Sequence, residues 1–156
     1  MESNLTTDFE QLVIAHKSTI YSVCYMFVET RAEADDLFQE VLINLWNGYD
    51  GFRGNSTLRS WVYRVSMNTC ISYKRKKHIN SVPLEIAPDI LSDDSPASRQ
   101  TAQLHKRISL LEPVDRAIVL LWLENLPYDE IASIIGISAK AVGVRLVRIK
   151  DKLKSL

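Results

Sequence analysis

A short segment near the C-terminus, residues 126–138, most restricts the fold that this chain can adopt. Its sequence is Leu-Pro-Tyr-Asp-Glu-Ile-Ala-Ser-Ile-Ile-Gly-Ile-Ser. Pro127 suits the start of a short helix, Gly136 permits a sharp turn after it, and Ser138 can cap a second helix. The small Ala132 falls where the two helices must approach each other closely. This spacing predicts a helix-turn-helix.

Helical patterning extends over most of the remaining sequence. Apolar residues recur at intervals of three and four residues, and the 156 residues include only five glycines, which favours helices over strands. Residues 79–98 contain three of the five prolines and four acids, which oppose regular structure. We therefore predict an all-α fold of two small helical domains, at 1–78 and 99–156, joined by a flexible linker at 79–98, with the helix-turn-helix in the second.

The formal net charge of zero conceals two strongly basic segments. Residues 51–78 hold seven bases and no acid, giving +7, and residues 138–156 hold six bases and one acid, giving +5. Residues 1–50, by contrast, hold nine acids and two bases, giving −7. Two separate basic segments on an otherwise acidic chain indicate two contacts with one polyanion.

The first basic segment also contains interleaved aromatic residues, namely Phe52, Trp61, Tyr63 and Tyr73. Flat rings stack on unpaired bases and cations attract phosphates, so this mixture is typical of a surface for single-stranded nucleic acid. A core helix with a solvated basic end would have a similar composition.

A helix over about 57–77, capped by Ser56, is expected to place several of these side chains together. Its buried positions would be Leu58, Trp61, Val62 and Val65. At roughly 100° per residue, Arg64, Asn68 and Arg75 fall within about 40° of one another, beside Trp61. Asparagine and arginine can hydrogen-bond to base edges, and tryptophan can stack on them.

The helix expected over 31–49 has an unusual outward side. Ile43 and Trp46 are set there among polar residues, namely Asp35, Asp36, Gln39 and Glu40. Apolar groups among acids indicate a candidate protein interface. Coverage of Trp46 by a neighbouring helix would explain the same pattern equally well.

Several classes of function lack support in the sequence. Paired carboxylates can serve acid–base chemistry or hold Mg²⁺, but the chain supplies no nucleophile, phosphate-binding loop or second set of ligands. The histidines are scattered, and Cys24 and Cys70 lie in helical patterns that suggest buried thiols in a reducing cytoplasm. No apolar stretch has the length of a membrane span, and the acidic start is unlike a signal peptide. We expect a cytoplasmic protein without membrane insertion, enzymatic activity, metal or cofactor.

Three blocks of residues follow one another along the chain. The first is Glu-Ala-Asp-Asp-Leu-Phe-Gln-Glu-Val at 33–41. The second is Phe-Arg-Gly at 52–54, followed by Leu-Arg-Ser-Trp-Val-Tyr-Arg-Val at 58–65 and Asn68. The third is Leu-Glu-Pro at 111–113 with Arg116, followed by Tyr-Asp-Glu-Ile-Ala at 128–132. In this order the blocks resemble those of bacterial RNA polymerase sigma factors of the extracytoplasmic-function (ECF) type, and the resemblance covers nearly the whole chain.

The resemblance implies three contact surfaces. Core polymerase, through the clamp helices of its β′ subunit, would be bound by Asp36, Gln39 and Glu40, on the same face as Asp35, Ile43 and Trp46. The melted minus-ten strand would meet Arg53, Asn55, Ser56, Trp61, Arg64 and Asn68, with Lys74 and Arg75 attracting phosphates. The minus-thirty-five duplex would face Ser138, Lys140, Arg145 and Arg148. An anti-sigma protein is a further implied partner.

The segment after Ser138 departs from the family pattern. The family usually has a small residue, then Thr-Val and a basic residue, whereas Lys140, Ala141, Val142 and Gly143 stand here. On the polar side of the same helix, Val144 and Val147 are either ordinary exposed valines or contacts for thymine methyl groups.

Two other functions fit parts of the sequence. A helix-turn-helix regulator that binds only duplex DNA would leave the aromatic and basic segment and the Ile43/Trp46 face unexplained. A helical adaptor that binds other regulators would leave both basic segments unexplained.

Overall fold

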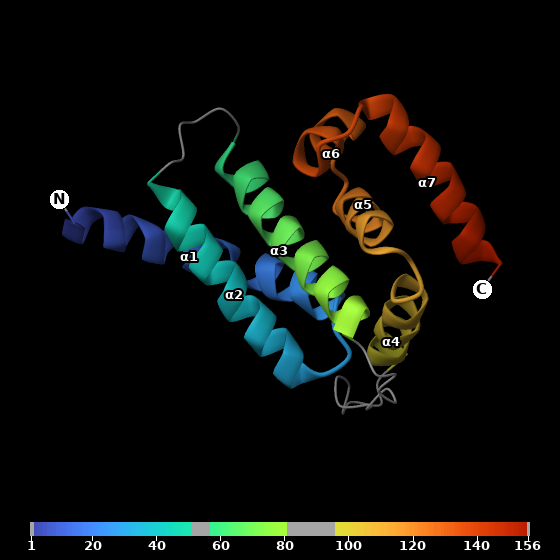
Figure 1. Cartoon of the computed structure of the whole chain (residues 1–156), viewed down its shortest axis with the longest axis horizontal. Coiled ribbons are helices and arrows are strands. Elements are labelled where there is room, and N and C mark those ends of the chain that lie inside the picture. The colour runs from blue at the N-terminus through green and yellow to red at the C-terminus, as the bar shows by residue number, and fades with distance from the viewer. Residues whose placement is uncertain (1, 51–56, 81–95, 156) are drawn as a thin grey trace.

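Helix α3 (Leu58–Asn80) occupies the centre of the molecule, with other helices packed on two sides of it (Figure 1). The computed structural model describes residues 2–50, 57–80 and 96–155, with the side chains of 7–50, 57–76, 99–100 and 102–155. Arg53, Asn55 and Ser56, predicted to contact DNA, lie outside these residues, as does most of the predicted linker.

The described residues form seven helices and no strand, which confirms the all-α prediction. Besides α3 they are α1 (Glu2–Tyr25), α2 (Arg31–Tyr49), α4 (Pro96–Ile108), α5 (Pro113–Leu123), α6 (Tyr128–Ile135) and α7 (Ala139–Lys154). Helices α1, α2 and α3 pack on one another, as do α5, α6 and α7. Helix α3 also contacts α5 and α6, so the two groups of helices share it.

The core is formed by the apolar residues that recur at intervals of three and four along the sequence and so share one arc of each helix. Within the first group, Phe27, Leu37, Leu45 and Met67 are all less than 2% exposed. Within the second group the same holds for Ile118, Leu121, Ile131 and Leu146. Burying a side chain of this size contributes about 1.5–3 kcal/mol, so these arcs decide which face of each helix turns inward.

Helix α3 starts close to the predicted position. The Thr57 hydroxyl oxygen accepts a hydrogen bond from the Ser60 N–H at 3.1 Å and so caps the first turn. The predicted cap, Ser56, lies outside the described residues. Leu58 is then the first helical residue and is 37% exposed, in contrast to the expected burial. At the first position of a helix, a side chain extends beyond most of the residues that cover the following turns.

The helix-turn-helix forms as predicted. Gly136 has φ 89° and ψ 32°, the left-handed conformation that glycine adopts without strain, and its N–H donates to the Ala132 carbonyl at 2.8 Å. Two residues later, the Ser138 hydroxyl oxygen accepts from the Ala141 N–H at 3.1 Å and caps α7. The chain thus reverses between α6 and α7 over Gly136, Ile137 and Ser138.

Gly143, inside α7, is a position where alanine should stabilise the fold. A Cβ atom there would lie 3.5 Å from Cε2 of Tyr128, an ordinary van der Waals contact. Glycine costs about 1 kcal/mol relative to alanine within a helix. We expect Gly143→Ala to raise the free energy of unfolding by about 0.5–1 kcal/mol in urea titrations.

Gly136→Ala is the matched control for that substitution. Because Gly136 has a positive φ, alanine there should lower the free energy of unfolding by about 1 kcal/mol. A loss of stability in both variants would contradict the prediction for Gly143.

Candidate functional site

An exposed face of mixed character lies on α2, where the sequence indicated a candidate protein interface. Ile43 is 59% exposed and Trp46 is 44% exposed, so neighbouring helices do not cover Trp46. Its ring contacts that of Phe9 in an edge-on arrangement, at a centroid distance of 5.0 Å. The Asp35 carboxylate accepts a hydrogen bond from the Tyr21 hydroxyl at 3.1 Å. The other acidic and amide members, Asp36, Gln39 and Glu40, are exposed.

Two hydrogen bonds join α3 to α2. The Tyr73 hydroxyl donates to the Glu33 carboxylate at 2.8 Å, and the Asn44 amide donates to the Thr69 hydroxyl oxygen at 2.9 Å. Burial and the bond to Glu33 raise the pKa of Tyr73 well above its ordinary value, so the phenol keeps its proton. These contacts lie on the face of α3 that packs against α2, and the ridge of Trp61, Arg64 and Asn68 lies on a different side of the helix.

That ridge carries the predicted strand-reading residues at different degrees of exposure. Asn68 and Arg75 are exposed, whereas Trp61 and Arg64 are partly buried. Lys74 lies farther along α3, with its Nζ atom 3.9 Å from a Glu29 carboxylate oxygen. Within the described residues, Asn68 is therefore the predicted base-reading side chain that is most open to a ligand.

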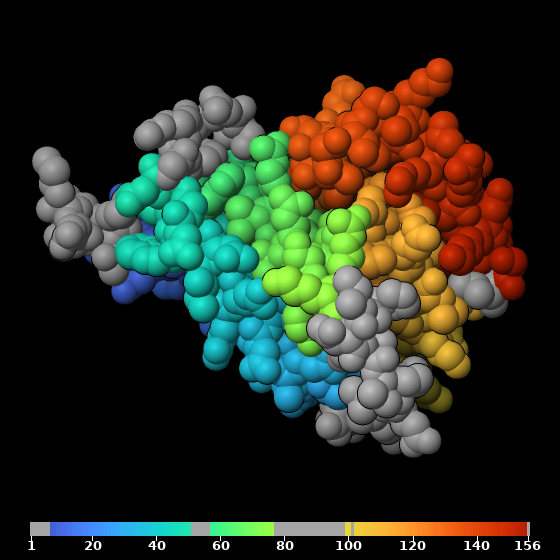
Figure 2. Space-filling view, in the orientation of Figure 1, coloured from blue at the N-terminus to red at the C-terminus, as the bar shows by residue number. Residues whose placement is uncertain are grey.

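Helix α6 of the helix-turn-helix lies against the same ridge. The Arg64 guanidinium donates to the Ser133 carbonyl at 2.9 Å and to its hydroxyl oxygen at 3.2 Å. One turn earlier, the Ser60 hydroxyl donates to the Glu130 carboxylate at 2.8 Å. Figure 2 shows the orange surface of the helix-turn-helix beside the green surface of α3. Nothing in the sequence pattern predicted this contact.

A second set of contacts joins α4 and α5 to the end of α1 and the turn that follows it. His105 Nε2 lies 2.7 Å from the Val28 carbonyl oxygen and 3.2 Å from that of Tyr25. Because both partners are acceptors, Nε2 carries the proton and donates. Arg116 also reaches this turn, donating to the Met26 carbonyl at 3.4 Å.

Arg116 is the most deeply buried charged side chain among the described residues, at 3% exposure. Its guanidinium donates to the carbonyls of Ser109 at 2.7 Å and Leu111 at 3.2 Å, and it lies 5.4 Å from the Phe27 ring centroid. Burial lowers the pKa of Arg116. Its role was not predicted from the sequence, although a single arginine on the apolar face of α5 is a visible signal.

Helix α7, the second helix of the helix-turn-helix, presents part of the predicted duplex-binding surface. Lys140 and Arg148 are exposed, and Val144 and Val147 are 47% and 61% exposed. Arg145 differs, because its guanidinium pairs with the Asp115 carboxylate of α5 at 3.1 Å. Arg145 therefore helps to hold α7 on α5 and presents less of its charge to a ligand than Lys140 and Arg148 do.

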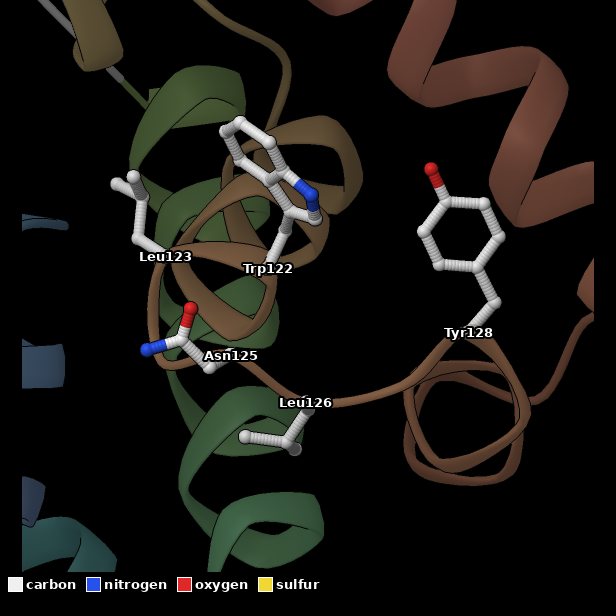
Figure 3. Close-up of a pocket in the computed structure, with 5 residues that line it drawn as sticks. All are labelled: Trp122, Leu123, Asn125, Leu126 and Tyr128. Carbon is white, nitrogen blue, oxygen red and sulfur yellow. The ribbon is translucent and has the colours of Figure 1, made fainter.

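An open hollow of about 340 Å³ lies beside the helix-turn-helix. It is lined by Trp122, Leu123, Asn125, Leu126 and Tyr128. Trp122 at the end of α5 and Tyr128 at the start of α6 stand on opposite sides of it (Figure 3). The Lys150 ammonium of α7 lies 4.4 Å from the Trp122 ring centroid. No sequence pattern indicated this hollow.

Metal binding and membrane insertion find no support in the described part of the chain. It contains no group of three or more His, Cys, Asp or Glu side chains placed to hold a metal ion. None of its helices combines the length and apolarity needed to cross a bilayer.

Cys24 and Cys70 are buried free thiols. Their mutual hydrogen bond and burial raise the pKa of Cys70 well above its ordinary value, which keeps it as a thiol.

Two protein-family descriptions match the two groups of helices. Residues 12–78 match Sigma-70 region 2, and residues 101–153 match Sigma-70 region 4. The first match contains the exposed face of α2 and the ridge of α3, and the second contains the helix-turn-helix.

Similar proteins carry sigma-factor names. The chain is 27% identical to the ECF RNA polymerase sigma factor SigG of Mycobacterium tuberculosis, over 96% of this chain but only 48% of SigG, so it spans about half the length of that relative. It is 26% identical to the ECF RNA polymerase sigma factor SigW of Bacillus subtilis, over 94% of this chain and 87% of SigW.

Two solved structures share the fold. CnrH, in complex with the cytosolic domain of CnrY, has a TM-score of 0.71 at 22% identity, over 96% of this chain and 87% of CnrH. RpoE of Bartonella quintana, in complex with the anti-sigma factor NepR, has a TM-score of 0.72 at 20% identity, over 95% of each chain. With both family regions present in order and ECF relatives aligned along nearly the whole chain, the chain belongs to the ECF type of RNA polymerase sigma factors.

Proposed function

We propose that this protein binds core RNA polymerase and directs promoter-specific initiation of transcription. One observation carries the proposal: a single chain of this family holds an exposed acidic and apolar face on α2, a basic and aromatic ridge on α3 and an exposed basic recognition helix. A polymerase subunit that recognises promoters needs all three surfaces. A duplex-binding regulator needs only the recognition helix, and an adaptor needs neither basic surface.

The three surfaces have separate roles in this proposal. The α2 face, with Ile43 and Trp46 at its centre, contacts the β′ clamp helices of the polymerase. The α3 ridge reads the separated minus-ten strand, because unpaired bases expose edges and faces that Asn68 and Trp61 can bind. The recognition helix α7 enters the minus-thirty-five duplex with Lys140 and Arg148.

The two parts of the chain act as domains at 1–78 and 99–156, joined by the linker at 79–98, and no step requires a catalytic residue. In the present arrangement, α6 occupies part of the α3 ridge through Arg64 and Ser60. Arg64 can face DNA only after its hydrogen bonds to Ser133 break. Promoter binding therefore requires the two domains to separate.

The partners follow from the same assignment. Core polymerase and promoter DNA place the protein in the cytoplasm. An anti-sigma protein is a third partner, supported by the similarity to RpoE, whose solved structure is a complex with the anti-sigma factor NepR.

Run-off transcription with purified core polymerase distinguishes this proposal from its rivals. Linear genomic fragments from the source organism serve as templates, with core polymerase alone and the protein alone as controls. We expect discrete transcripts only when both proteins are present. A duplex-binding regulator or an adaptor would give no transcript on any fragment, and that result would refute the proposal.

Substitutions on the α2 face test how the protein contacts polymerase. Gln39→Ala combined with Glu40→Lys should weaken association with core by about tenfold or more, because it removes an amide and places a cation where an anion stood. Glu10→Lys makes the same change of charge on an exposed site of α1 and is the control. Co-purification with core that is equal for both variants would show that this face is not the contact.

A further inference from the structure

The Trp61 side chain lies in a small cluster of rings from three helices. Its ring centroid is 6.2 Å from that of Tyr49, with the ring planes at 44°. Tyr49 in turn contacts Phe9 of α1 at 5.6 Å and 60°, and Phe9 contacts Trp46 at 5.0 Å and 68°. Edge-on and tilted pairs at these distances are the arrangements that aromatic rings prefer. The cluster links the face of α2 to the ridge of α3.

The absence of a side chain at Gly48, near the end of α2, lets the Trp61 ring approach the α2 backbone. A Cβ atom at Gly48 would lie 3.3 Å from Cζ2 of the Trp61 ring, which is tighter than most contacts of real Cβ atoms. Glycine therefore lets the indole lie directly against the α2 backbone, with Tyr49 beside it. These contacts restrict where the Trp61 ring can lie, even though the side chain is only partly buried.

We propose that Tyr49 and Phe9 are positioning residues for Trp61. Neither touches the DNA in this scheme. Tyr49 holds the indole at the start of α3, where it stacks on or separates bases, and Phe9 supports Tyr49 from α1. The proposal rests on the proposed function, and it adds residues of α1 and of the end of α2 to strand reading. Only Trp61 itself was predicted from the sequence.

A Trp61 ring that is free to move should make promoter opening less favourable, because its conformational freedom is lost when it binds a base. A stacking side chain that is already held in place loses little conformational freedom when it binds a base. Without the Tyr49 ring, that ordering has to occur during opening. The loss of one aromatic contact corresponds to roughly a two- to tenfold change in an equilibrium constant.

Open-complex formation on a fragment that yields a run-off transcript tests the proposal. Permanganate reactivity of thymines measures opening, and it is normalised to the amount of protein bound to core. We expect Tyr49→Leu to lower opening by about threefold or more, and Phe9→Leu to lower it less, because Phe9 acts through Tyr49. Tyr49→Phe keeps the ring and should open as wild type does.

Two further variants separate positioning from a general loss of structure. Phe38→Leu removes another aromatic contact between α1 and α2, to Tyr21 at 5.8 Å, and should leave normalised opening unchanged. In a Trp61→Ala background, Tyr49→Leu should have no additional effect, because its target is absent. An additional effect there, or equal opening by Tyr49→Leu and Phe38→Leu, would overturn the inference. A wild-type protein that opens no fragment would instead overturn the proposed function.

Discussion

Replacing Arg116 with methionine is expected to lower the free energy of unfolding by about 3 kcal/mol. The guanidinium is 3% exposed and donates to the carbonyls of Met26, Ser109 and Leu111. Methionine fills much of the same volume but cannot donate, so these acceptors lose a charged partner in a place that water scarcely reaches. Each buried acceptor left without a donor costs about 1–3 kcal/mol.

Urea denaturation followed by circular dichroism measures this effect, and Arg107→Met is the control. Arg107 is an exposed arginine of α4, so the same chemical change there should alter the free energy of unfolding by less than about 0.5 kcal/mol. Equal stability of the two variants would mean that the Arg116 bonds contribute nothing beyond the packing of its methylene groups.

Replacing Asn68 with alanine is expected to reduce promoter opening by about tenfold while leaving core association intact. Asn68 is exposed on the α3 ridge, one turn from Arg64, and an amide can make two hydrogen bonds with the edge of an unpaired base. A contact of that kind contributes about 1–3 kcal/mol of discrimination, which corresponds to roughly five- to 150-fold.

Permanganate footprinting of the wild-type and variant holoenzymes checks this result, with co-purification as the measure of core association. Asn44→Ala provides a comparison, because it removes a hydrogen bond to Thr69 between α2 and α3 but no group of the ridge. We expect this control to open the promoter within about twofold of wild type. Equal footprints for all three proteins would exclude Asn68 as a base contact.

The role of Asn68 could be predicted from the sequence, whereas that of Arg116 could not. Asn68 was identified from the sequence, because its position relative to Trp61 and Arg64 depends only on the geometry of one helix. The role of Arg116 depends on the turn after α1, ninety residues earlier in the chain. Helical periodicity indicates that residue 116 faces inward but not which backbone groups it meets.

The same distinction explains which surfaces were anticipated. The Gly136 turn and the Ser138 cap follow from interactions within a few residues, and the structure has them as predicted. The sequence left open whether a neighbouring helix covers Trp46, because its exposure depends on how the helices pack. The pairing of Arg145 with Asp115 was missed because it joins α7 to α5.

Patterns within the sequence are sufficient to show that this chain is helical, that it contains a helix-turn-helix and that its positive charge is concentrated in two segments. Those properties arise from local periodicity, turn chemistry and composition, which act over a few residues. The contact of α6 with the α3 ridge and the ring contacts among Phe9, Tyr49 and Trp61 are visible only once the helices are packed. Arg64 and Ser133 are 69 residues apart, and a contact of that kind depends on how whole apolar faces pack together.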